Sequence, residues 1–461
     1  MRHMINDSIL GTMGNTPLVR LHRVARSVDA QIIAKIEFFN PGGSIKDRIG
    51  IQIIEDAEKE DRLKPGGTIV ESTSGNTGVG LAIAAALRGY RCIFVMPDKM
   101  SQEKVHLLRA FGARVIITPT EVEPEDPRSY YSVAKRIVAE TPNSILADQY
   151  HNPSNPKTHE LTTGPEIWEQ TGGEVDVFVC GIGTGGTITG VSRYLKKQNP
   201  NIKIIGVDPL GSILYEHFKT GGFGKAEGYK IEGIGEDFVP TSYDPSTVDD
   251  IVQVNDKESF LMTRRLVREE GIFCGISAGS AVIGALRYAT REKLSADQKL
   301  VVILPDSGSR YLSKVFDDDW MRENSMLDPI GTGASVETLL DRRVGHHLIV
   351  AACTESVGSV IDKMRQHNIS QLPVIDEQQK LLGLVREVDL LNHMLGHGSV
   401  NAALEDANVI SHDSVTVAPD TPLESLMNTF SSQSVVIVKD GDEVRDIITK
   451  IDVIDFLANA V

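Results

Sequence analysis

The chain has 461 residues, of which 41% are hydrophobic and 24% charged, and its formal net charge at pH 7 is -16. This length predicts two or three domains, and the composition excludes a disordered chain. The negative charge argues against nucleic acid as a partner. No apolar run at the N-terminus or elsewhere suits a signal peptide or a membrane span, so a cytoplasmic protein without a membrane partner is expected.

The cysteines and histidines give no sign of a metal site. The four cysteines lie far apart in the sequence and form no CxxC pair: Cys92, Cys180, Cys274 and Cys353. Zinc clusters and disulfide frameworks both require closer or denser spacing, so a reducing compartment is favoured. The twelve histidines show no ligand spacing either, and we expect no metal.

The first two thirds of the chain alternate between strand-like and helix-like segments. Strands are predicted over residues 68–71, 92–95, 114–118, 177–180, 202–207 and 300–304. Helices are predicted over residues 79–88, 102–111 and a segment that ends near residue 198. Apolar, β-branched strands that alternate with helices predict an α/β fold with two parallel-sheet subdomains.

The character of the sequence changes near residue 328. Residues 328–335, DPIGTGAS, have the composition of a linker. Two similar segments follow, each with the order helix, strand, acidic turn, strand, helix, and a duplication explains them better than coincidence. The predicted boundaries are a catalytic domain over 1–327, a linker over 328–338, a first repeat over 339–398 and a second over 399–461.

Residues 40–48, NPGGSIKDR, contain the first residue suited to catalysis. The two glycines allow a sharp turn, and Ser44 is a suitable N-cap for a helix beginning around Ile45. Lys46 would lie in the first helical turn, where the helix dipole opposes its charge and lowers its proton affinity. Such a lysine suits Schiff-base chemistry, although a solvated lysine at a helix start explains this segment alone more simply.

Three further turns each follow a predicted strand. Residues 72–78, STSGNTG, would form either an anion site at a helix start or a capped turn. Residues 181–187, GIGTGGT, have the composition of a phosphate-binding loop but lack the spacing of a P-loop or a dinucleotide fold, and a plain tight turn is the alternative. Residues 304–308, LPDSG, place Ser307 at the carboxyl end of a strand, where ligands bind in open α/β sheets, or form an ordinary turn.

Taken in this order, SIKDR, TSGNTG, GTGGT and LPDSG resemble the fold type II pyridoxal-phosphate enzymes, and in particular the cysteine synthase/cystathionine β-synthase family. The two repeats resemble a CBS-domain pair, or Bateman module, so the resemblance covers essentially the whole chain. It implies pyridoxal 5'-phosphate as cofactor. The implied cofactor-binding residues are Lys46, which would hold it as a Schiff base, with Asn76, Gly183, Thr184, Gly185, Gly186, Thr187 and Ser307.

The resemblance also implies where substrates bind. The implied substrate residues are Thr73, Ser74, Thr77 and Gln149 at the α-carboxylate, with Tyr150 and Gly233 in the cleft. A serine such as Ser307 supports the pyridine nitrogen less strongly than a carboxylate, which favours loss of a β-leaving group over transamination. Glu236 stands where animal relatives carry tyrosine, so it is a candidate contact to the thiol substrate and leaves that substrate's identity open.

The implied activity is a β-replacement that joins L-serine and L-homocysteine into L-cystathionine, with hydrogen sulfide release from cysteine as a side reaction. Cysteine synthase activity on O-acetylserine and sulfide is the main alternative. A nucleotide sensor with a degenerate catalytic domain is an alternative of another class. The expected partners are small-molecule substrates and further copies of the chain, as a homodimer or homotetramer.

The repeats and the N-terminus refine this resemblance. A Ser/Thr three residues before an Asp is typical of adenosyl-binding CBS domains; the second repeat has Thr449 and Asp452, but the first has Arg386 before Asp389. One effector site, for S-adenosylmethionine or an adenine nucleotide, is therefore expected, with a purely dimer-forming module as the alternative. The catalytic pattern begins at once and no cysteine precedes Cys92, so no haem is expected.

Overall fold

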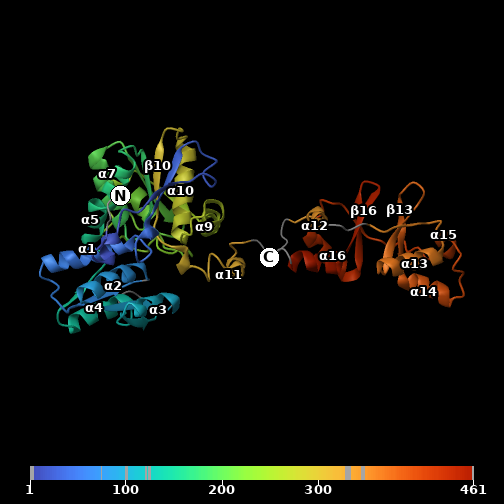
Figure 1. Cartoon of the computed structure of the whole chain (residues 1–461), viewed down its shortest axis with the longest axis horizontal. Helices are drawn as coiled ribbons and strands as arrows, with labels where there is room; N and C mark the ends of the chain where they lie inside the picture. Colours follow the sequence, from blue (N-terminus) through green and yellow to red (C-terminus); the bar gives the residue numbers. More distant parts are fainter. Residues whose placement is uncertain are drawn as a thin grey trace. The chain divides into compact units, whose positions relative to one another are not determined.

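The computed structural model describes residues 5–73, 75–98, 102–119, 122, 126–327, 334–343 and 348–458. The chain divides into two compact units, residues 1–327 and 328–461 (Figure 1). Most of the predicted linker, residues 328–333, lies outside the described part. The predicted α/β architecture is confirmed, because helices cover two parallel sheets in the first unit and the second holds two smaller sheets.

The larger sheet of the first unit has six strands in the order β1-β2-β10-β7-β8-β9. All neighbours are parallel except β1 and β2. Its strands are β1 (Leu18–Arg20), β2 (Gln31–Ile36), β7 (Val177–Gly181), β8 (Lys203–Pro209), β9 (Asp250–Val254) and β10 (Lys299–Leu304). The helices that follow from residue 154 on are α5 (Ser154–Leu161), α6 (Thr163–Gln170), α7 (Gly186–Gln198), α8 (Leu214–Thr220), α9 (Asp256–Glu270), α10 (Ile276–Glu292) and α11 (Asp318–Glu323). We call this part the large subdomain.

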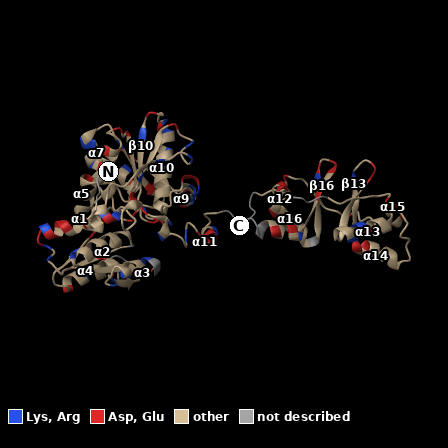
Figure 2. Cartoon of the chain, viewed as in Figure 1, with Lys and Arg blue, Asp and Glu red and all other residues tan. Residues whose placement is uncertain are grey.

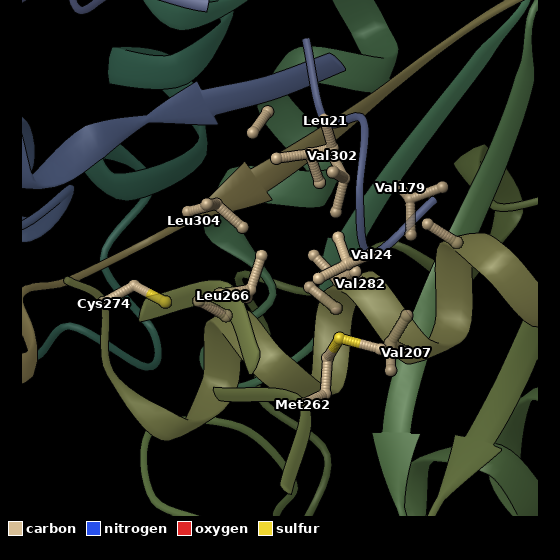
Figure 3. Packing of buried hydrophobic residues seen from close by; sticks show 14 of the residues in the cluster. Leu21, Val24, Val179, Val207, Met262, Leu266, Cys274, Val282, Val302 and Leu304 are labelled. Carbon is tan, nitrogen blue, oxygen red and sulfur yellow. The ribbon is translucent and has the colours of Figure 1, made fainter. Parts of the chain in front are cut away.

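Apolar side chains between this sheet and helices α9 and α10 form the core of the large subdomain (Figure 3). Val302 on β10, Val179 on β7 and Val207 on β8 are fully buried, as are Leu266 and Val282 from the two helices. A parallel strand covered on both faces needs such near-continuous apolar residues. This burial fixes the carboxyl ends of β7 and β10 beside each other.

The smaller sheet has four parallel strands in the order β5-β4-β3-β6. They are β3 (Thr68–Ser72), β4 (Arg91–Pro97), β5 (Arg114–Thr118) and β6 (Ser144–Leu146). Its helices are α1 (Lys46–Lys59), α2 (Asn76–Arg88), α3 (Gln102–Ala110) and α4 (Tyr130–Glu140), and we call this part the small subdomain. Helix α2 begins three residues before the predicted start, because the polar residues of the turn already adopt helical geometry.

Helices α1 and α2 contact each other through their backbones. A Cβ atom added at Gly80 in α2 would lie 2.5 Å from the carbonyl oxygen of Lys46, the first residue of α1. Gly50 in α1 meets the backbone of Gly80 in the same way. Because side chains are absent at both positions, the two helix starts are held at a fixed separation.

We expect Gly80→Ala to lower the free energy of unfolding by roughly 1–3 kcal/mol, because the new methyl group overlaps the backbone of α1. Urea denaturation measures this change. The matched control is Gly228→Ala, where an added Cβ meets nothing within 4 Å and the backbone is not left-handed. Equal stability of the two variants would contradict the close contact.

The second unit contains two sheets of the same design, ordered β11-β12-β13 and β14-β15-β16. The first repeat consists of β11 (Ala351–Ala352), α13 (Val357–His367), β12 (Gln371–Ile375), β13 (Leu381–Arg386) and α14 (Glu387–Leu395). The second consists of β14 (Thr416–Val417), α16 (Leu423–Ser432), β15 (Val435–Asp440), β16 (Glu443–Thr449) and α17 (Lys450–Ala458). The predicted order of helix, strand, turn, strand, helix is present in both.

Each repeat also packs against a short helix that lies outside its predicted bounds or in the segment before the repeats. Helix α12 (Val336–Arg342) precedes the first repeat, yet Val336 and Leu339 are buried in the core of the second. Helix α15 (Leu404–Ala407) follows the predicted boundary at residue 398, yet Leu404 is buried in the core of the first. Packing and sequence similarity therefore divide this unit at different places.

All four cysteines are described, buried and free. Acidic and basic residues are interspersed over helix ends and loops (Figure 2). Among the described residues, no helix combines the length and apolarity needed to cross a bilayer.

Candidate active site

Lys46 begins α1 beside the carboxyl end of β10. The backbone N–H of Lys46 donates to Ser44 Oγ at 3.2 Å. The helix begins one residue later than predicted, so its N-cap is Ile45 and not Ser44. The N–H of Ile45 donates to the carbonyl of Pro305 at 2.8 Å. The turn before Lys46 is thereby attached to the segment that follows β10.

The side chain of Lys46 lines a cavity with the glycine-rich loop after β7. Burial lowers the pKa of Lys46, although the nearby Cys180, Glu236 and Asp306 oppose this shift. A larger share of the amine is then unprotonated near neutral pH, which is the form that acts as nucleophile or base. The sequence predicts that the helix dipole lowers the pKa of Lys46, whereas burial is the main cause of the lowered pKa.

Gly183, Thr184, Gly185 and Thr187 line the same cavity, between β7 and the start of α7. Gly185 has a left-handed backbone with φ of 78°, and a Cβ at Gly183 would lie 2.6 Å from the carbonyl oxygen of Gly233. Side chains would therefore fill this loop, and glycine keeps its N–H groups accessible at a helix N-terminus. The arrangement suits a phosphate group.

Two buried residues of α5 support the threonines of this loop. Asn155 Nδ2 donates to Thr184 Oγ1 at 3.0 Å. His159 is bonded through Nδ1 to Thr163 Oγ1 at 2.9 Å and through Nε2 to Thr187 Oγ1 at 3.2 Å. Burial holds the pKa of His159 well below its usual range, so the ring is neutral. Neither residue was predicted from the sequence, since their partners in the loop, Thr184 and Thr187, lie 29 and 28 residues away.

Ser307 follows β10, and its N–H donates to the carbonyl of Gly43 at 3.2 Å, close to Lys46. Asn76, at the start of α2, donates through Nδ2 to Asp306 Oδ2 at 2.9 Å. The Asp306 carboxylate also accepts from the Tyr311 hydroxyl at 2.7 Å. Asp306 therefore connects Asn76 to the segment that carries Ser307, whereas the cavity beside Lys46 is lined by neither Asn76 nor Ser307.

The predicted carboxylate-binding residues gather at the edge of the small subdomain. Thr77 Oγ1 donates to Gln149 Oε1 at 2.5 Å, and Thr73 Oγ1 accepts from the N–H of Gly75 at 3.1 Å. Ser74 lies outside the described residues. Thr73, Thr77 and Gln149 are all buried, so an anion bound there would be shielded from solvent.

Glu236 and Tyr150 form a second polar group near Lys46. The Tyr150 hydroxyl bonds to the Glu236 carboxylate, and Tyr150 packs edge-on against Phe238 with ring centroids 5.1 Å apart. Burial and the neighbouring Asp237 raise the pKa of Glu236 to about 8. The Glu236 carboxyl can therefore exchange a proton near neutral pH.

Glu232 bridges the two subdomains beside this group. Its Oε2 pairs with Lys104 Nζ of α3 at 2.6 Å, and its Oε1 pairs with Lys314 Nζ at 2.6 Å. Lys104 belongs to the small subdomain, whereas Glu232 and Lys314 both belong to the large one. Of these two ion pairs, only the pair with Lys104 therefore connects the two subdomains.

We expect Lys104→Gln to increase amide hydrogen exchange in α3, because it removes the ion pair between subdomains. Lys314→Gln is the matched control, since it removes an equally short pair within one subdomain. Exchange measured by mass spectrometry on both variants separates the two roles. Equal exchange in α3 would contradict the assignment of Lys104 as the bridging residue.

A buried network of ion pairs holds the first turn of α1 through Arg48. Arg48 pairs with Glu37 at 2.8 Å and with Glu166 at 2.6 Å, and Lys35 pairs with Glu166 at 2.8 Å. Burial raises the pKa of Glu166, but the hydrogen bonds and charges of Arg48 and Lys35 outweigh it and lower the pKa to about 2. The network connects residues more than a hundred positions apart.

The lowered pKa of Glu166 makes stability depend on pH. Its contribution, on the order of 3 kcal/mol, is complete above the ordinary pKa of 4.5 and is lost as pH falls toward 2. The difference in free energy of unfolding between the native protein and Glu166→Gln should shrink over that range. Asp126→Asn is the control, because its partner Arg128 is exposed and water screens that ion pair, so its loss should change the free energy of unfolding little. A pH-independent difference for Glu166→Gln would refute the prediction.

In the second repeat, Thr449 and Asp452 lie in contact. Thr449 donates to Asp452 Oδ2 through its N–H at 2.7 Å and through its hydroxyl at 2.6 Å. In the first repeat, Arg386 Nε pairs with Asp389 Oδ2 at 2.8 Å. Among the described residues, no cluster of three or more His, Cys, Asp or Glu side chains could hold a metal ion.

Comparisons with known proteins agree with this geometry. The family model for pyridoxal-phosphate dependent enzymes matches residues 9–306, and the CBS domain model matches residues 343–396 and 406–459. A hydrogen sulfide-producing enzyme from Fusobacterium nucleatum is 37% identical with a TM-score of 0.61, over 67% of this chain and 100% of that one. A cysteine synthase from Entamoeba histolytica is 38% identical with a TM-score of 0.64, over 71% and 97%. The fold is that of a pyridoxal-phosphate dependent enzyme with a pair of CBS domains.

Proteins named cystathionine beta-synthase match along nearly the whole chain. Those of Dictyostelium discoideum, Oryctolagus cuniculus and Saccharomyces cerevisiae are 41%, 45% and 35% identical. The alignments cover 99%, 85% and 98% of this chain, and 93%, 72% and 98% of those relatives. The chain therefore belongs to the cystathionine β-synthase family.

The family implies pyridoxal phosphate, and the residues of the site fit this cofactor. The cavity offers an amine of lowered pKa at Lys46 and a glycine-rich helix start suited to a phosphate. Asp306 Oδ1, in the residue before Ser307, is buried and has no hydrogen-bond partner among the described residues. This oxygen could therefore accept one further hydrogen bond.

Proposed function

We propose that the protein condenses L-serine with L-homocysteine to L-cystathionine by β-replacement. The observation that carries this proposal is the cavity in which Lys46 and the loop 183–187 lie together, at the carboxyl ends of β7 and β10. The full-length relatives named cystathionine beta-synthase support the choice of substrates.

The proposed catalytic roles are those that the family resemblance implies, and the geometry around Lys46 supports them. Bound pyridoxal phosphate supplies an electron sink for the substrate's Cα electrons. Lys46 would anchor the cofactor, then remove the Cα proton and return a proton to the departing serine hydroxyl. Its lowered pKa supports both transfers. Residues Gly183 to Thr187 would bind the phosphate, while Ser307 and Asn76 would contact the pyridine nitrogen and phenolic oxygen.

The substrates would be bound from two sides. Thr73, Ser74, Thr77 and Gln149 would bind the serine carboxylate, which orients Cα toward Lys46. Gly233 and Tyr150 would shape the cleft for the incoming thiol. Glu236, with its raised pKa, would bind the amino group of homocysteine in its carboxylate form. We therefore expect homocysteine to bind more weakly as pH falls below about 8.

A cysteine synthase that uses O-acetylserine and sulfide is the second candidate. The similarity of the catalytic part to the cysteine synthase and to the sulfide-producing enzyme favours it. The CBS-domain pair and the coverage of the full-length relatives favour cystathionine synthesis. Hydrogen sulfide release from cysteine is compatible with either.

A nucleotide sensor with an inactive catalytic part is a candidate of another class. The presence of Lys46, Asn76 and Ser307 in the sequence, with the buried amine of Lys46 lining a cavity, argues against it. We further propose one effector site, at Thr449 and Asp452, for S-adenosylmethionine or an adenine nucleotide. The protein would be a haem-free, cytoplasmic homodimer or homotetramer.

The test is to incubate the purified protein with L-serine, with and without L-homocysteine, and to measure cystathionine. A parallel assay with O-acetylserine and sulfide distinguishes the second candidate. Lys46→Ala should lose turnover by at least a hundredfold and also lose the visible absorbance of the Schiff base. A Lys46→Ala variant that still formed cystathionine would refute the assignment, and turnover of O-acetylserine alone would favour the cysteine synthase.

A further inference from the structure

Arg343 contacts Asp452, one of the two proposed effector residues, from outside the second repeat. Its Nη2 lies 3.2 Å from Asp452 Oδ1, and its Nη1 lies 3.3 Å from Asp446 Oδ2. The same Nη1 donates to the carbonyl of Ile447 at 3.0 Å. These acceptors all belong to the second repeat, whereas Arg343 ends helix α12, which precedes the first.

The contact occupies the part of Asp452 that a ligand needs. Asp452 Oδ2 already accepts the N–H and hydroxyl of Thr449, both from the start of the same helix. Oδ1 is therefore the oxygen left for a ligand hydroxyl, and the Arg343 guanidinium lies on it. The three side chains are 14–19% exposed, so water weakens this pairing less than at a fully exposed site.

The first repeat provides a comparison within the same chain. There Arg386 occupies the position of Thr449 and pairs with its own Asp389 through Nε at 2.8 Å and Nη2 at 3.2 Å. Both aspartates are thus neutralised by a guanidinium. In the first repeat the cation belongs to the same turn, whereas in the second it comes from a separate segment and can leave without unfolding the turn.

The segment that carries Arg343 lies near the beginning of the second unit in sequence. The first unit ends at Leu327, and α12 begins at Val336. Ser335 forms a bridge with Pro422, and the N–H of Val336 donates to the carbonyl of Thr421 at 2.9 Å. These contacts hold the beginning of α12 on the second repeat, while Arg343 holds its end.

We propose that Arg343 is a releasable latch on the effector site. The hydroxyl groups of an adenosyl ligand replace the guanidinium at Asp452, and the end of α12 is then freed from the second repeat. This inference rests on the proposed effector role of Thr449 and Asp452. It adds the step by which binding would reach helix α12, the first described helix after the catalytic unit in sequence.

Amide hydrogen exchange of the full-length protein without ligand tests the latch alone. We expect Arg343→Gln to increase exchange over residues 336–343, and Arg343→Lys, which keeps one charge, to give an intermediate increase. Arg386→Gln is the matched control and should leave that segment unchanged. A melting curve for each variant identifies any global loss of fold, and unchanged exchange in Arg343→Gln would overturn the latch.

Isothermal titration with AMP, ATP and S-adenosylmethionine tests release by ligand. Removal of a competing ion pair worth about 1 kcal/mol should make Arg343→Gln bind the responding ligand about fivefold more tightly than the native protein. Weaker binding would mean that Arg343 holds the ligand, which overturns the latch. No heat with any ligand, from either form, would overturn the effector site itself, even where the exchange data support the contact.

Discussion

The catalytic half depends on the backbone contact between helices α1 and α2. Lys46 is the first residue of α1 and Asn76 the first of α2, and glycines at positions 50 and 80 let the two helices meet without intervening side chains. The ion network around Arg48 holds α1 from the other side. Two residues proposed to contact the cofactor, Lys46 and Asn76, are thus positioned by one helix pair.

Each turn of the site is ambiguous by itself in the sequence, and the site is implied only by the resemblance of the four motifs taken together. The lysine turn, the glycine-rich loop and the serine after β10 all follow buried strands, and the carboxyl ends of neighbouring parallel strands meet at one edge. What the patterns could not predict depends on contacts between distant segments. His159 reaches Thr187, and Lys104 reaches Glu232, only after helices from separate parts of the chain have packed.

The same distinction explains the C-terminal unit. Its internal duplication is visible in sequence because each repeat has its own alternating strands and helix. The placement of α12 in the core of the second repeat has no sequence signal, since it depends on which apolar surface the helix finds. Helix α12 follows the catalytic unit in sequence and precedes the first repeat, yet it packs as part of the second repeat.

The burial of the cysteines has a chemical consequence for an enzyme proposed to handle thiols. Burial raises the pKa of Cys92 and of Cys180 to about 12, and raises that of Cys274 as well. Thiol–disulfide exchange requires a thiolate, and these thiols stay protonated near neutral pH. Cys180 lines the active-site cavity itself, yet it does not compete with a substrate thiolate. Burial therefore makes Cys92, Cys180 and Cys274 poor nucleophiles toward the disulfides that form from thiol metabolites.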